Sequence, residues 1–282
     1  MKIGFCKLLW ATNVTKKHTD ILRDLKKTGY DGVEIPVFGG RPKNYATLGR
    51  LLDDIGLERT TISVIPDLAR NPSSPDKEAR KAAADYLNWL TDCSVALGAK
   101  QLSGPLMQPL GYFTGKAPTE KEWKHAAGVH RKAGDYAAEN GLTIVLEAVN
   151  RFEIYFANTM DDLCRYTRMV DHPNIKPMYD TFHANIEEAD PVAAYTRNAK
   201  DLVYVHISEN DRGVPGRGHV PWKETFAALK KAKYDGWLTI EAFGRGLPEL
   251  AAATRVWRDF AESPEAVYRD GYKFIRKSWD AA

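Results

Sequence analysis

Short apolar runs alternate with longer amphipathic segments along almost the whole chain. The short runs have the composition of buried strands, and the longer segments space their apolar residues as helices do. Strands are predicted near residues 2–9, 31–36, 58–65, 100–103, 142–148, 175–180, 202–207 and 236–242. Helices are predicted near residues 16–28, 43–55, 75–97, 119–139, 158–171, 187–199, 221–233 and 247–260. Eight strands alternating with eight helices in 282 residues are typical of a (β/α)8 barrel, with a doubly wound sheet as the alternative.

The predicted ends of the helices agree with this alternation. Glycine readily adopts the left-handed conformation that ends many helices. Glycines follow four of the predicted helices, at Gly29, Gly56, Gly98 and Gly141. Helix starts are also marked: Pro75 stands at an expected first helical position, Thr119 and Glu122 form a capping box, and Pro221 opens the seventh helix.

A short segment occurs twice along the chain. It reads KKTGYDG at 26–32 and KKAKYDG at 230–236, and each copy leads into a predicted strand that contains a glutamate, Glu34 or Glu241. Two copies are too few to establish a repeat. They indicate that the second and eighth strands are entered in the same way.

One domain is expected, a single barrel over residues 1–282, because no linker rich in glycine, serine or proline divides the chain. The segment 264–279 is predicted to form an extra helix at the C-terminus. Three long loops, 66–74, 104–118 and 208–220, follow the third, fourth and seventh predicted strands. They therefore lie on the carboxyl side of the strands, which is the functional face of a barrel.

The fifth to the eighth predicted strands each end in a side chain that can bind a metal ion. These residues are Glu147, Asp180, His206 and Glu241. Each one alone would most simply be a hydrogen-bonded structural residue, although a buried carboxylate is unfavourable unless it is paired or bound to a metal. Parallel strands bring their carboxyl ends to one mouth, and structure alone gives no reason for four such ends in a row. The mixed oxygen and imidazole donors predict a site for one divalent cation.

Further polar residues follow these strand ends. His183 leaves the sixth strand on the mouth side, and Glu153 and Arg212 each stand six residues beyond a predicted ligand. They are near enough to line the same pocket, with solvated loop charges as the alternative. Four histidines in helices or turns are expected at the surface: His18, His125, His130 and His172. His219, in the seventh loop, has no assigned role.

The seventh and eighth loops contain the segments ENDRGVPGRG and FGRG, which are rich in glycine and arginine. In barrels these two loops often bind a phosphate group. A sugar phosphate is therefore an alternative substrate, and a plain flexible loop is equally compatible with the composition.

The composition restricts the class of protein. With 44% hydrophobic residues but no apolar stretch of about 20 residues, the chain is expected to be a globular protein that does not span a membrane. A net charge of +3 is too small a bias for a nucleic-acid binder. The N-terminus reads as a first strand and not as a signal peptide. Three widely separated cysteines, Cys6, Cys93 and Cys164, fit reduced thiols and a cytoplasmic location.

The second half of the chain contains segments in a distinctive order: LEAVNRFE, YDTFHANIEE, HISENDRG followed by GRGHVPW, and IEAF. In combination they resemble the ketose 3-epimerases, which include D-tagatose 3-epimerase and D-psicose (D-allulose) 3-epimerase, within the xylose isomerase-like TIM barrels. The resemblance spans most of the chain and is tightest from 143 to 260. It implies that the metal ligands are Glu147, Asp180, His206 and Glu241, which in this family usually hold Mn²⁺ or a similar ion such as Co²⁺ or Mg²⁺.

The resemblance also implies roles in catalysis. The two glutamates correspond to the family's acid/base pair, and Glu153, His183 and Arg212 correspond to the groups that hold the sugar near O1 to O3. It further implies a small-molecule ketose as substrate and a homo-oligomer, either a dimer or a tetramer. The first strand departs from the family pattern, because Cys6-Lys7-Leu8 replaces an aromatic-rich segment.

The expected reaction is metal-dependent epimerisation at C3 of free ketoses, both ketohexoses such as tagatose, fructose and psicose and ketopentoses. Inverting a carbon beside a ketone requires proton removal on one face and proton return on the other, so two acid/base groups must flank the substrate. A divalent ion would stabilise the cis-enediolate between the two steps.

Four other functions use the same barrel. An aldose–ketose isomerase would move hydrogen between C1 and C2, and a sugar-phosphate epimerase or isomerase would use the arginine-rich loops. A multi-zinc endonuclease is disfavoured, because only His183, His206 and at most His219 are near the mouth. A non-catalytic sugar-binding barrel would need no second glutamate.

Substrate choice is expected to divide between the two halves of the barrel. The residues predicted at the mouth of strands one to four are mostly apolar: Trp10, Pro36, Ile65, Pro66, Met107, Tyr112 and Phe113. An apolar surface discriminates poorly between hydroxyl configurations. Several ketohexoses should therefore be accepted.

Overall fold

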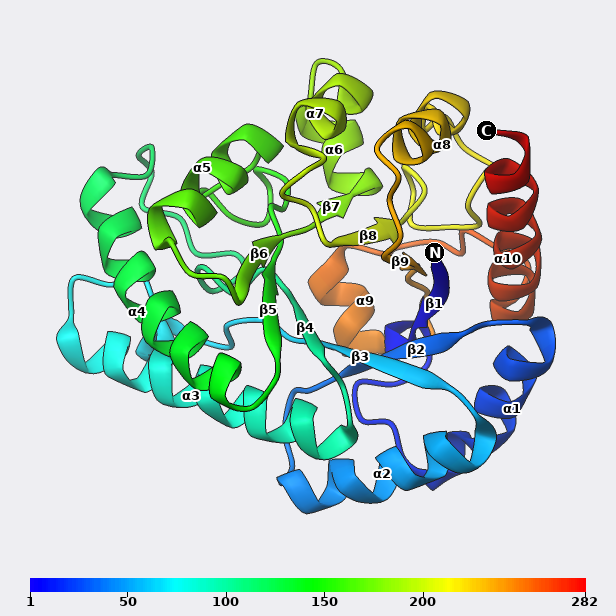
Figure 1. Ribbon diagram of the computed structural model, residues 1–282, viewed down its shortest axis with the longest axis horizontal. Helices are drawn as coiled ribbons and strands as arrows, with labels where there is room; N and C mark the ends of the chain where they lie inside the picture. Colours follow the sequence, from blue (N-terminus) through cyan, green and yellow to red (C-terminus); the bar gives the residue numbers. More distant parts are fainter.

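A parallel barrel forms the centre of the molecule in the computed structural model, which describes residues 1–282 (Figure 1). Its strand segments are β1 (Lys2–Cys6), β2 (Gly32–Pro36), β3 (Glu58–Ile62), β4 (Gln101–Gly104), β5 (Thr143–Leu146), β6 (Ile175–Pro177), β7 (Tyr179–Asp180), β8 (Tyr204–Ile207) and β9 (Trp237–Ile240). They lie in the order β6-β5-β4-β3-β2-β1-β9-β8-β7. The predicted (β/α)8 fold is confirmed.

The sixth barrel strand is made of two pieces, β6 and β7, which are separated at Met178. The Met178 N–H donates to the carbonyl oxygen of Leu146 in β5 over 3.0 Å. β6 pairs with β5, and β7 pairs with β8. The ring of strands is therefore completed through this one interrupted strand.

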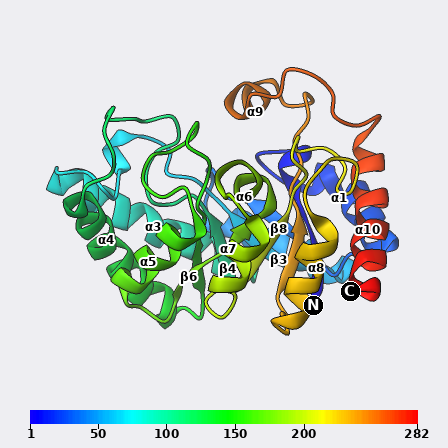
Figure 2. The ribbon, with the colours of Figure 1, turned by 90° about the horizontal axis from the view of Figure 1, so that it is seen from above.

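Eight helices cover the outside of the barrel (Figures 1 and 2). They are α1 (Thr19–Thr28), α2 (Pro42–Ile55), α3 (Lys77–Leu97), α4 (Glu120–Glu139), α5 (Met160–Val170), α7 (Pro191–Asn198), α8 (Trp222–Lys231) and α10 (Pro264–Ala281). Neighbouring helices pack side by side; the Tyr136 hydroxyl of α4, for example, donates to Asp92 of α3 over 2.7 Å. None of the helices combines the length and the apolar composition that crossing a membrane requires.

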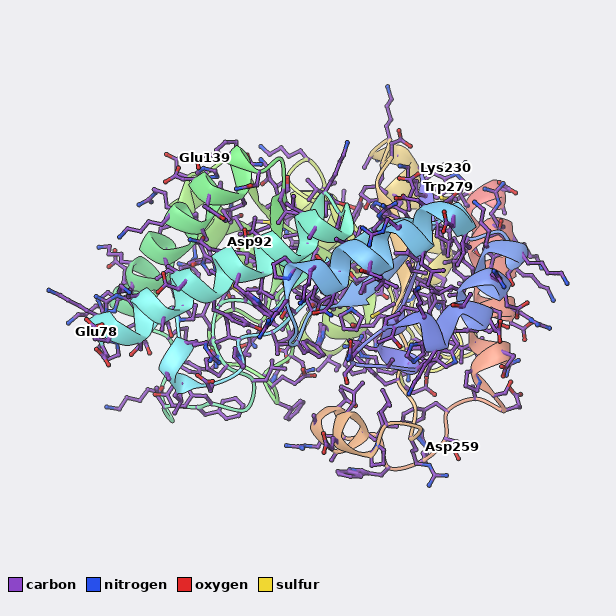
Figure 3. All side chains as sticks on the ribbon, turned by 90° about the horizontal axis from the view of Figure 1, so that it is seen from below. Glu78, Asp92, Glu139, Lys230, Asp259 and Trp279 are labelled. Carbon is purple, nitrogen blue, oxygen red and sulfur yellow. The ribbon has the colours of Figure 1, made fainter.

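Two short helices lie outside this ring: α6 (Thr181–Glu187), which follows β7 directly, and α9 (Pro248–Thr254), which follows β9. In Figure 1 α9 lies over the middle of the ring of strands, and Figure 3 shows the segment with α9 and Asp259 standing away from the ring helices. The helix predicted at 247–260 thus ends early, because Arg255 takes a left-handed conformation with φ of 60°.

The predicted C-terminal helix is present as α10, and it fills the eighth place in the outer ring. On one side the Tyr30 hydroxyl, just after α1, donates to the Tyr268 carbonyl oxygen over 2.7 Å. On the other side the Lys230 ammonium of α8 lies 5.0 Å from the centre of the Trp279 ring (Figure 3). α10 therefore joins α8 to α1, and α9 is free to cover the mouth.

Several predicted boundaries shift by a few residues. The first strand ends at Cys6 instead of residue 9, because a 3-10 helix, Lys7–Leu9, follows it at once. The third helix begins at Lys77 and not at Pro75, because the Asp76 side chain accepts a hydrogen bond from the Glu78 N–H. The predicted helix at 187–199 is present as α7 but begins only at Pro191, and the short helix α6 precedes it.

Other boundary predictions are confirmed. Gly29, Gly56 and Gly98 are left-handed caps, whereas Gly141, also with positive φ, follows the cap residue Asn140. Thr119 and Glu122 form the capping box, with the Thr119 N–H donating to Glu122 Oε2 over 2.7 Å.

One continuous cluster of 64 buried residues forms most of the core, with two smaller clusters of 6 and 4 residues beside it. His130 of α4 belongs to this interior, so its predicted surface position is wrong. Its Nδ1 lies 2.5 Å from the Tyr166 hydroxyl and its Nε2 lies 3.1 Å from the Leu106 carbonyl oxygen. The helical pattern could not distinguish this satisfied buried ring from an exposed one. His18, His125 and His172 are partly exposed.

Candidate active site and metal centre

The four predicted strand-end residues meet at the carboxyl end of the barrel. Glu147 follows β5, Asp180 ends β7, His206 lies in β8, and Glu241 follows β9. One nitrogen or oxygen atom from each lies within 4.8 Å of the atoms from the others, and all four side chains are buried. This arrangement could hold a metal ion.

Backbone contacts at the strand ends place these side chains. The Gly104 carbonyl at the end of β4 accepts a hydrogen bond from the Glu147 N–H over 3.0 Å. Gly104 has a φ of 132°, and a Cβ there would collide with the Ser63 carbonyl oxygen. Only glycine therefore suits this position, because other residues avoid this φ and have a Cβ.

Asp180 caps the helix that follows it. Its Oδ1 accepts hydrogen bonds from the N–H groups of Phe182 and His183, over 2.6 and 3.3 Å. The first turn of α6 therefore occupies one carboxylate oxygen and directs the other, Oδ2, to the cluster. No helix was predicted between the strand at 175–180 and the helix at 187–199, so this short helix was missed.

Two buried atoms of the cluster have no hydrogen-bond partner, namely Glu147 Oε1 and His206 Nδ1. His206 Nδ1 lies 3.4 Å from Asp180 Oδ2, 3.7 Å from Glu147 Oε1 and 3.8 Å from Glu241 Oε2. Buried polar atoms are rarely left unpaired. A cation between these oxygen and imidazole donors would satisfy both atoms, so the donor set fits a divalent metal ion.

The electrostatics of the cluster also favour a cation. Burial raises the pKa of Glu147 to about 8, and burial raises the pKa of Glu241 even though Arg212 opposes the shift. Burial also opposes ionisation of Asp180, but the Arg212 guanidinium and His206 hold its pKa well below the usual value. Three ionised carboxylates in one buried space need additional positive charge.

Arg212 reaches into the cluster from the loop after β8. Its Nη1 donates to Asp180 Oδ2 over 3.1 Å, to Ser208 Oγ over 2.8 Å, and to Glu241 Oε2. Its guanidinium carbon lies 3.9 Å from the centre of the Phe182 ring. Arg212 thus supplies one buried positive charge at the edge of the predicted metal site.

His183 and Glu153 lie beside the cluster. The Asn150 N–H donates to His183 Nδ1 over 3.0 Å, which leaves Nε2 as the ring nitrogen that faces the cluster. That Nε2 lies 3.7 Å from Glu147 Oε1 and 2.9 Å from Arg212 Nη2. Burial lowers the pKa of His183 to about 4, although Asp180 opposes the shift, which keeps the ring neutral. Glu153 Oε1 accepts a hydrogen bond from Asn150 over 2.8 Å.

A cavity of about 220 Å³ opens above the cluster. One side contains five polar residues, here termed the polar wall, namely Glu147, Glu153, His183, Arg212 and Glu241, with the apolar Val149, Phe182 and Phe243 beside them. The opposite side, termed the apolar wall, consists of Leu8, Phe38, Ile62, Val64, Pro105 and Leu110. Residues Leu250, Ala253 and Thr254 of α9 also line the cavity.

The apolar wall has the predicted chemistry but different residues. None of the seven residues expected at the mouth of strands one to four lines the cavity. Ile65 and Met107, for example, are buried in the core, whereas Phe113 is 45% exposed on the long loop after β4. Residues one or two positions away in the sequence line the cavity instead, among them Leu8, Phe38, Val64 and Leu110.

Arg217, His219 and Arg245 of the seventh and eighth loops do not line the cavity. Arg217 pairs with Glu262 and Asp270, both over distances below 3.0 Å. Arg245 pairs with Asp259 over 2.5 Å. His219 Nε2 lies 3.3 Å from the Asn185 amide nitrogen. The exposed arginines are therefore engaged with carboxylates and are not directed at a phosphate in the cavity.

Glu34 of β2 is a buried residue of the site that was not predicted. Its two carboxylate oxygens lie 3.2 and 3.1 Å from His206 Nε2. The only sequence signal was the repeated segment that enters β2 and β9, which placed Glu34 and Glu241 in corresponding strands. A glutamate inside an otherwise apolar strand is the feature that could have identified it.

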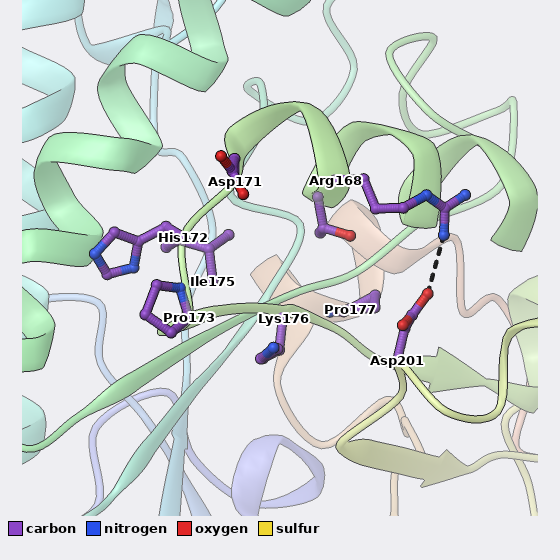
Figure 4. Close-up of a pocket in the computed structure, with 9 residues that line it drawn as sticks. Arg168, Asp171, His172, Pro173, Ile175, Lys176, Pro177 and Asp201 are labelled. Atoms are coloured by element: carbon purple, nitrogen blue, oxygen red, sulfur yellow. Dashed lines mark hydrogen bonds and ion pairs between the residues drawn. The ribbon is translucent and has the colours of Figure 1, made fainter.

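A second hollow lies at the opposite, amino end of the barrel, between α5 and β6 (Figure 4). Arg168 and Asp201 form an ion pair of 2.9 Å at its edge, and His172 and Lys176 line it. It shares no residue with the cavity above the cluster. In barrels this end contributes to stability and not to catalysis.

The chain is similar to known proteins over nearly its whole length. The family model for xylose isomerase-like TIM barrels matches residues 22–278. A D-psicose 3-epimerase from Ruminiclostridium cellulolyticum is 34% identical, over 94% of this chain and 92% of that protein. An L-ribulose 3-epimerase from a Methylomonas species is 32% identical, over 90% of this chain and 88% of that protein.

Solved structures lead to the same family. The structure of an L-ribulose 3-epimerase superposes with a TM-score of 0.93 at 27% identity and covers 99% of this chain and 95% of that one. A D-psicose 3-epimerase from Clostridium cellulolyticum H10, crystallised with D-tagatose, gives a TM-score of 0.89 at 28% identity, with 99% of both chains covered. The chain belongs to the xylose isomerase-like TIM barrel family and, within it, to the ketose 3-epimerases, which are isomerases.

Proposed function

We propose that this protein epimerises free ketoses at C3, with ketohexoses such as tagatose, fructose and psicose, and also ketopentoses, as substrates. The observation that carries the proposal is the pair Glu147 and Glu241, two buried glutamates from non-adjacent strands that line one cavity beside a predicted metal site. Relatives named as L-ribulose and D-psicose 3-epimerases support the choice of reaction.

The two glutamates would exchange the C3 proton. One carboxylate removes the proton from one face of C3, and the other carboxylic acid returns a proton to the opposite face. Burial raises the pKa of both groups, to about 8 for Glu147. A raised pKa makes it easier for each glutamate to exchange a proton near neutral pH. Each serves as the base for one epimer, so the reaction is reversible.

Three neighbouring groups would hold the sugar near O1 to O3. His183 presents its Nε2 to the cavity, and Arg212 offers guanidinium N–H groups as hydrogen-bond donors. Glu153, fixed by Asn150, offers a carboxylate acceptor. All three line the cavity beside Glu147 and Glu241, so they are placed to orient the carbon that reacts.

We also propose that the ligands of the metal ion are Glu147, Asp180, His206 and Glu241. When bound, a divalent ion would polarise the ketone and stabilise the negative charge that develops on the enediolate. Mn²⁺ is the expected ion, with Co²⁺ or Mg²⁺ as alternatives, because every donor is oxygen or imidazole and none is thiolate. Chelation should abolish turnover. Full activity of protein shown to be metal-free by elemental analysis would contradict the proposal.

Hydrogen exchange with solvent tests the reaction itself. In deuterated water the product should carry deuterium at C3 and none at C1, as measured by NMR or mass spectrometry. Deuterium at C1 would instead identify an aldose–ketose isomerase. Binding of ketoses without any turnover or exchange would indicate a sugar-binding barrel.

We also propose an oligomeric state and a cellular location for the protein. A homo-oligomer, a dimer or a tetramer, is supported by large apolar side chains exposed on the mouth-side loops, among them Phe152 at 73% and Trp257 at 69% exposure. Light scattering on the purified protein tests this assembly. A cytoplasmic location is supported by three cysteines that are buried and free.

A further inference from the structure

Glu34 contacts the predicted metal site from the inside of the barrel without lining the cavity. Its carboxylate is fully buried, and its one ion pair is with His206, which is also fully buried. An isolated buried carboxylate would be strongly unfavourable. The imidazole of His206 therefore stabilises the buried carboxylate of Glu34, and the same contact must in turn affect His206.

We propose that Glu34 is a positioning residue, which holds the hydrogen of His206 on Nε2 so that the Nδ1 lone pair faces the predicted metal site. This inference rests on the proposed function, because it assigns His206 as a ligand. It concerns a residue that neither lines the cavity nor belongs to the proposed ligand set.

Carboxylates lie on both sides of the His206 ring and compete for its single N–H hydrogen. A neutral imidazole has one N–H donor and one acceptor nitrogen. On the Nδ1 side lie three carboxylates, those of Asp180, Glu147 and Glu241, at 3.4, 3.7 and 3.8 Å. In the absence of an acceptor on the other side, these carboxylates would draw the hydrogen to Nδ1, and the protonated Nδ1 could not bind a metal.

Glu34 supplies that acceptor. A carboxylate can only accept, and both of its oxygens lie within 3.2 Å of His206 Nε2. His206 Nδ1 makes no hydrogen bond. The geometry therefore places the hydrogen on Nε2 and leaves Nδ1 free on the side of the other three ligands.

The surroundings of Glu34 keep its carboxylate in place. The Ser103 hydroxyl of β4 donates to Glu34 Oε1 over 2.7 Å. Cys6 of β1 stands directly beside Glu34 in the strand register. Glu34 lies in the middle of β2 and has no access to solvent. A carboxylate held in this way also fixes the rotation of the His206 ring.

The test compares Glu34→Gln with the wild-type protein in the metal-free state and during Mn²⁺ titration. An amide keeps the shape of the side chain but removes the charge that attracts the Nε2 hydrogen. Nitrogen NMR of the His206 ring, recorded at a pH where the ring is neutral, should show hydrogen on Nε2 in the wild type and a population with hydrogen on Nδ1 in the variant. The Mn²⁺ dissociation constant, measured by calorimetry, should rise about 10- to 100-fold, as is usual when a carboxylate behind a ligand histidine is lost.

Two further variants show whether the effect is specific to the contact between Glu34 and His206. Thr61→Val removes a buried hydrogen bond of β3, between Thr61 and Ser94, that does not reach His206. It should lower stability while leaving the tautomer and the Mn²⁺ dissociation constant unchanged. Ser103→Ala, which removes the donor to Glu34, should change both quantities in the same direction as Glu34→Gln but by less.

The proposal is overturned if His206 carries its hydrogen on Nδ1 in the metal-free wild type. It is also overturned if Glu34→Gln leaves both the tautomer and the Mn²⁺ dissociation constant unchanged. The tautomer is measured without metal and without substrate. A protein with the expected tautomer that fails to epimerise any ketose would therefore contradict the proposed function and leave the role of Glu34 supported.

Discussion

The two walls of the cavity differ in chemistry although they belong to one barrel. The polar wall comes from the strands and loops after β5, and it contains five ionisable side chains. The apolar wall comes from the loops after β1 to β4 and contains no charged side chain. The difference indicates that one half of the barrel performs the reaction, whereas the other encloses the substrate and excludes water. Specificity should therefore be strict near C1 to C3 and loose beyond them.

The half of the barrel with the apolar wall still contributes to the chemistry from beneath. Glu34 of β2 and Ser103 of β4 lie behind the apolar wall and contact the His206 ring directly or through one hydrogen bond. The two halves of the barrel therefore differ in the residues that line the cavity. Both halves, however, contribute residues that hold the lining side chains in place.

The largest expected effect is on the polar wall. Glu147→Gln or Glu241→Gln keeps the shape and one possible ligand oxygen but removes a base. Because each glutamate is proposed to act in both directions, either change should lower kcat by at least about 10²- to 10⁴-fold for both epimers. Rates in both directions should be measured by product analysis.

Metal content is the control for these two variants. A variant that has lost its ion would be inactive for a different reason, so elemental analysis must accompany the rates. A variant with a full complement of metal that retains normal rates in either direction would contradict the assignment of that glutamate.

The second prediction concerns His130, which contacts the loop after β4 in the half of the barrel that forms the apolar wall. His130 holds the Leu106 carbonyl of the loop after β4, and burial lowers its pKa to about 4. The unfolded chain, with an ordinary histidine pKa near 6.5, binds the proton more strongly than the folded protein below that pH. Stability should therefore fall as the pH drops from about 7 to 4, by about 3 kcal/mol from this residue.

Urea unfolding at the two pH values measures this loss. In His130→Gln the amide can still donate to Leu106 but does not titrate, so the loss between pH 7 and 4 should be smaller by about 3 kcal/mol. An equal loss in both proteins would show that His130 is not the group responsible.

A smaller effect is expected from changes in the substrate beyond C3. The apolar wall offers no side-chain hydrogen bond to O6, so a 6-deoxyketohexose should retain kcat/KM within about 10-fold of its parent. Several ketohexoses that differ at C4 and C5 should also be accepted. A loss of 10³-fold or more on removing O6, which is typical of a site built to bind that hydroxyl, would show that a polar group faces this end of the sugar.

The smallest effect is expected from the arginines outside the cavity. Arg217 and Arg245 form partly exposed ion pairs, which contribute about 0 to 1 kcal/mol each. Arg217→Gln and Arg245→Gln should change kcat/KM for a free ketose by less than about 5-fold. A strong preference for a phosphorylated sugar that disappears in either variant would assign the seventh or eighth loop to phosphate binding after all.

The sequence alone was sufficient for the barrel and for the four clustered strand-end residues. Strands and helices alternate at a regular spacing, and all strands of a parallel barrel end on the same side. Four consecutive strands that end in Glu147, Asp180, His206 and Glu241 must therefore bring these side chains to one mouth. This inference needs no knowledge of how any side chain packs.

Only the tertiary structure decided which other residues join the site. Every residue of β2 is buried, so alternation along the strand does not distinguish Glu34, which faces the inside of the barrel, from its neighbours. The same holds for His130, whose buried position depends on its contacts with Tyr166 and Leu106. The helix α9 has the local pattern of an outer helix, yet it covers the mouth because α10 already fills the space between α8 and α1. Local sequence patterns indicate burial and periodicity. Which helices occupy the outer ring, however, depends on how the whole chain packs.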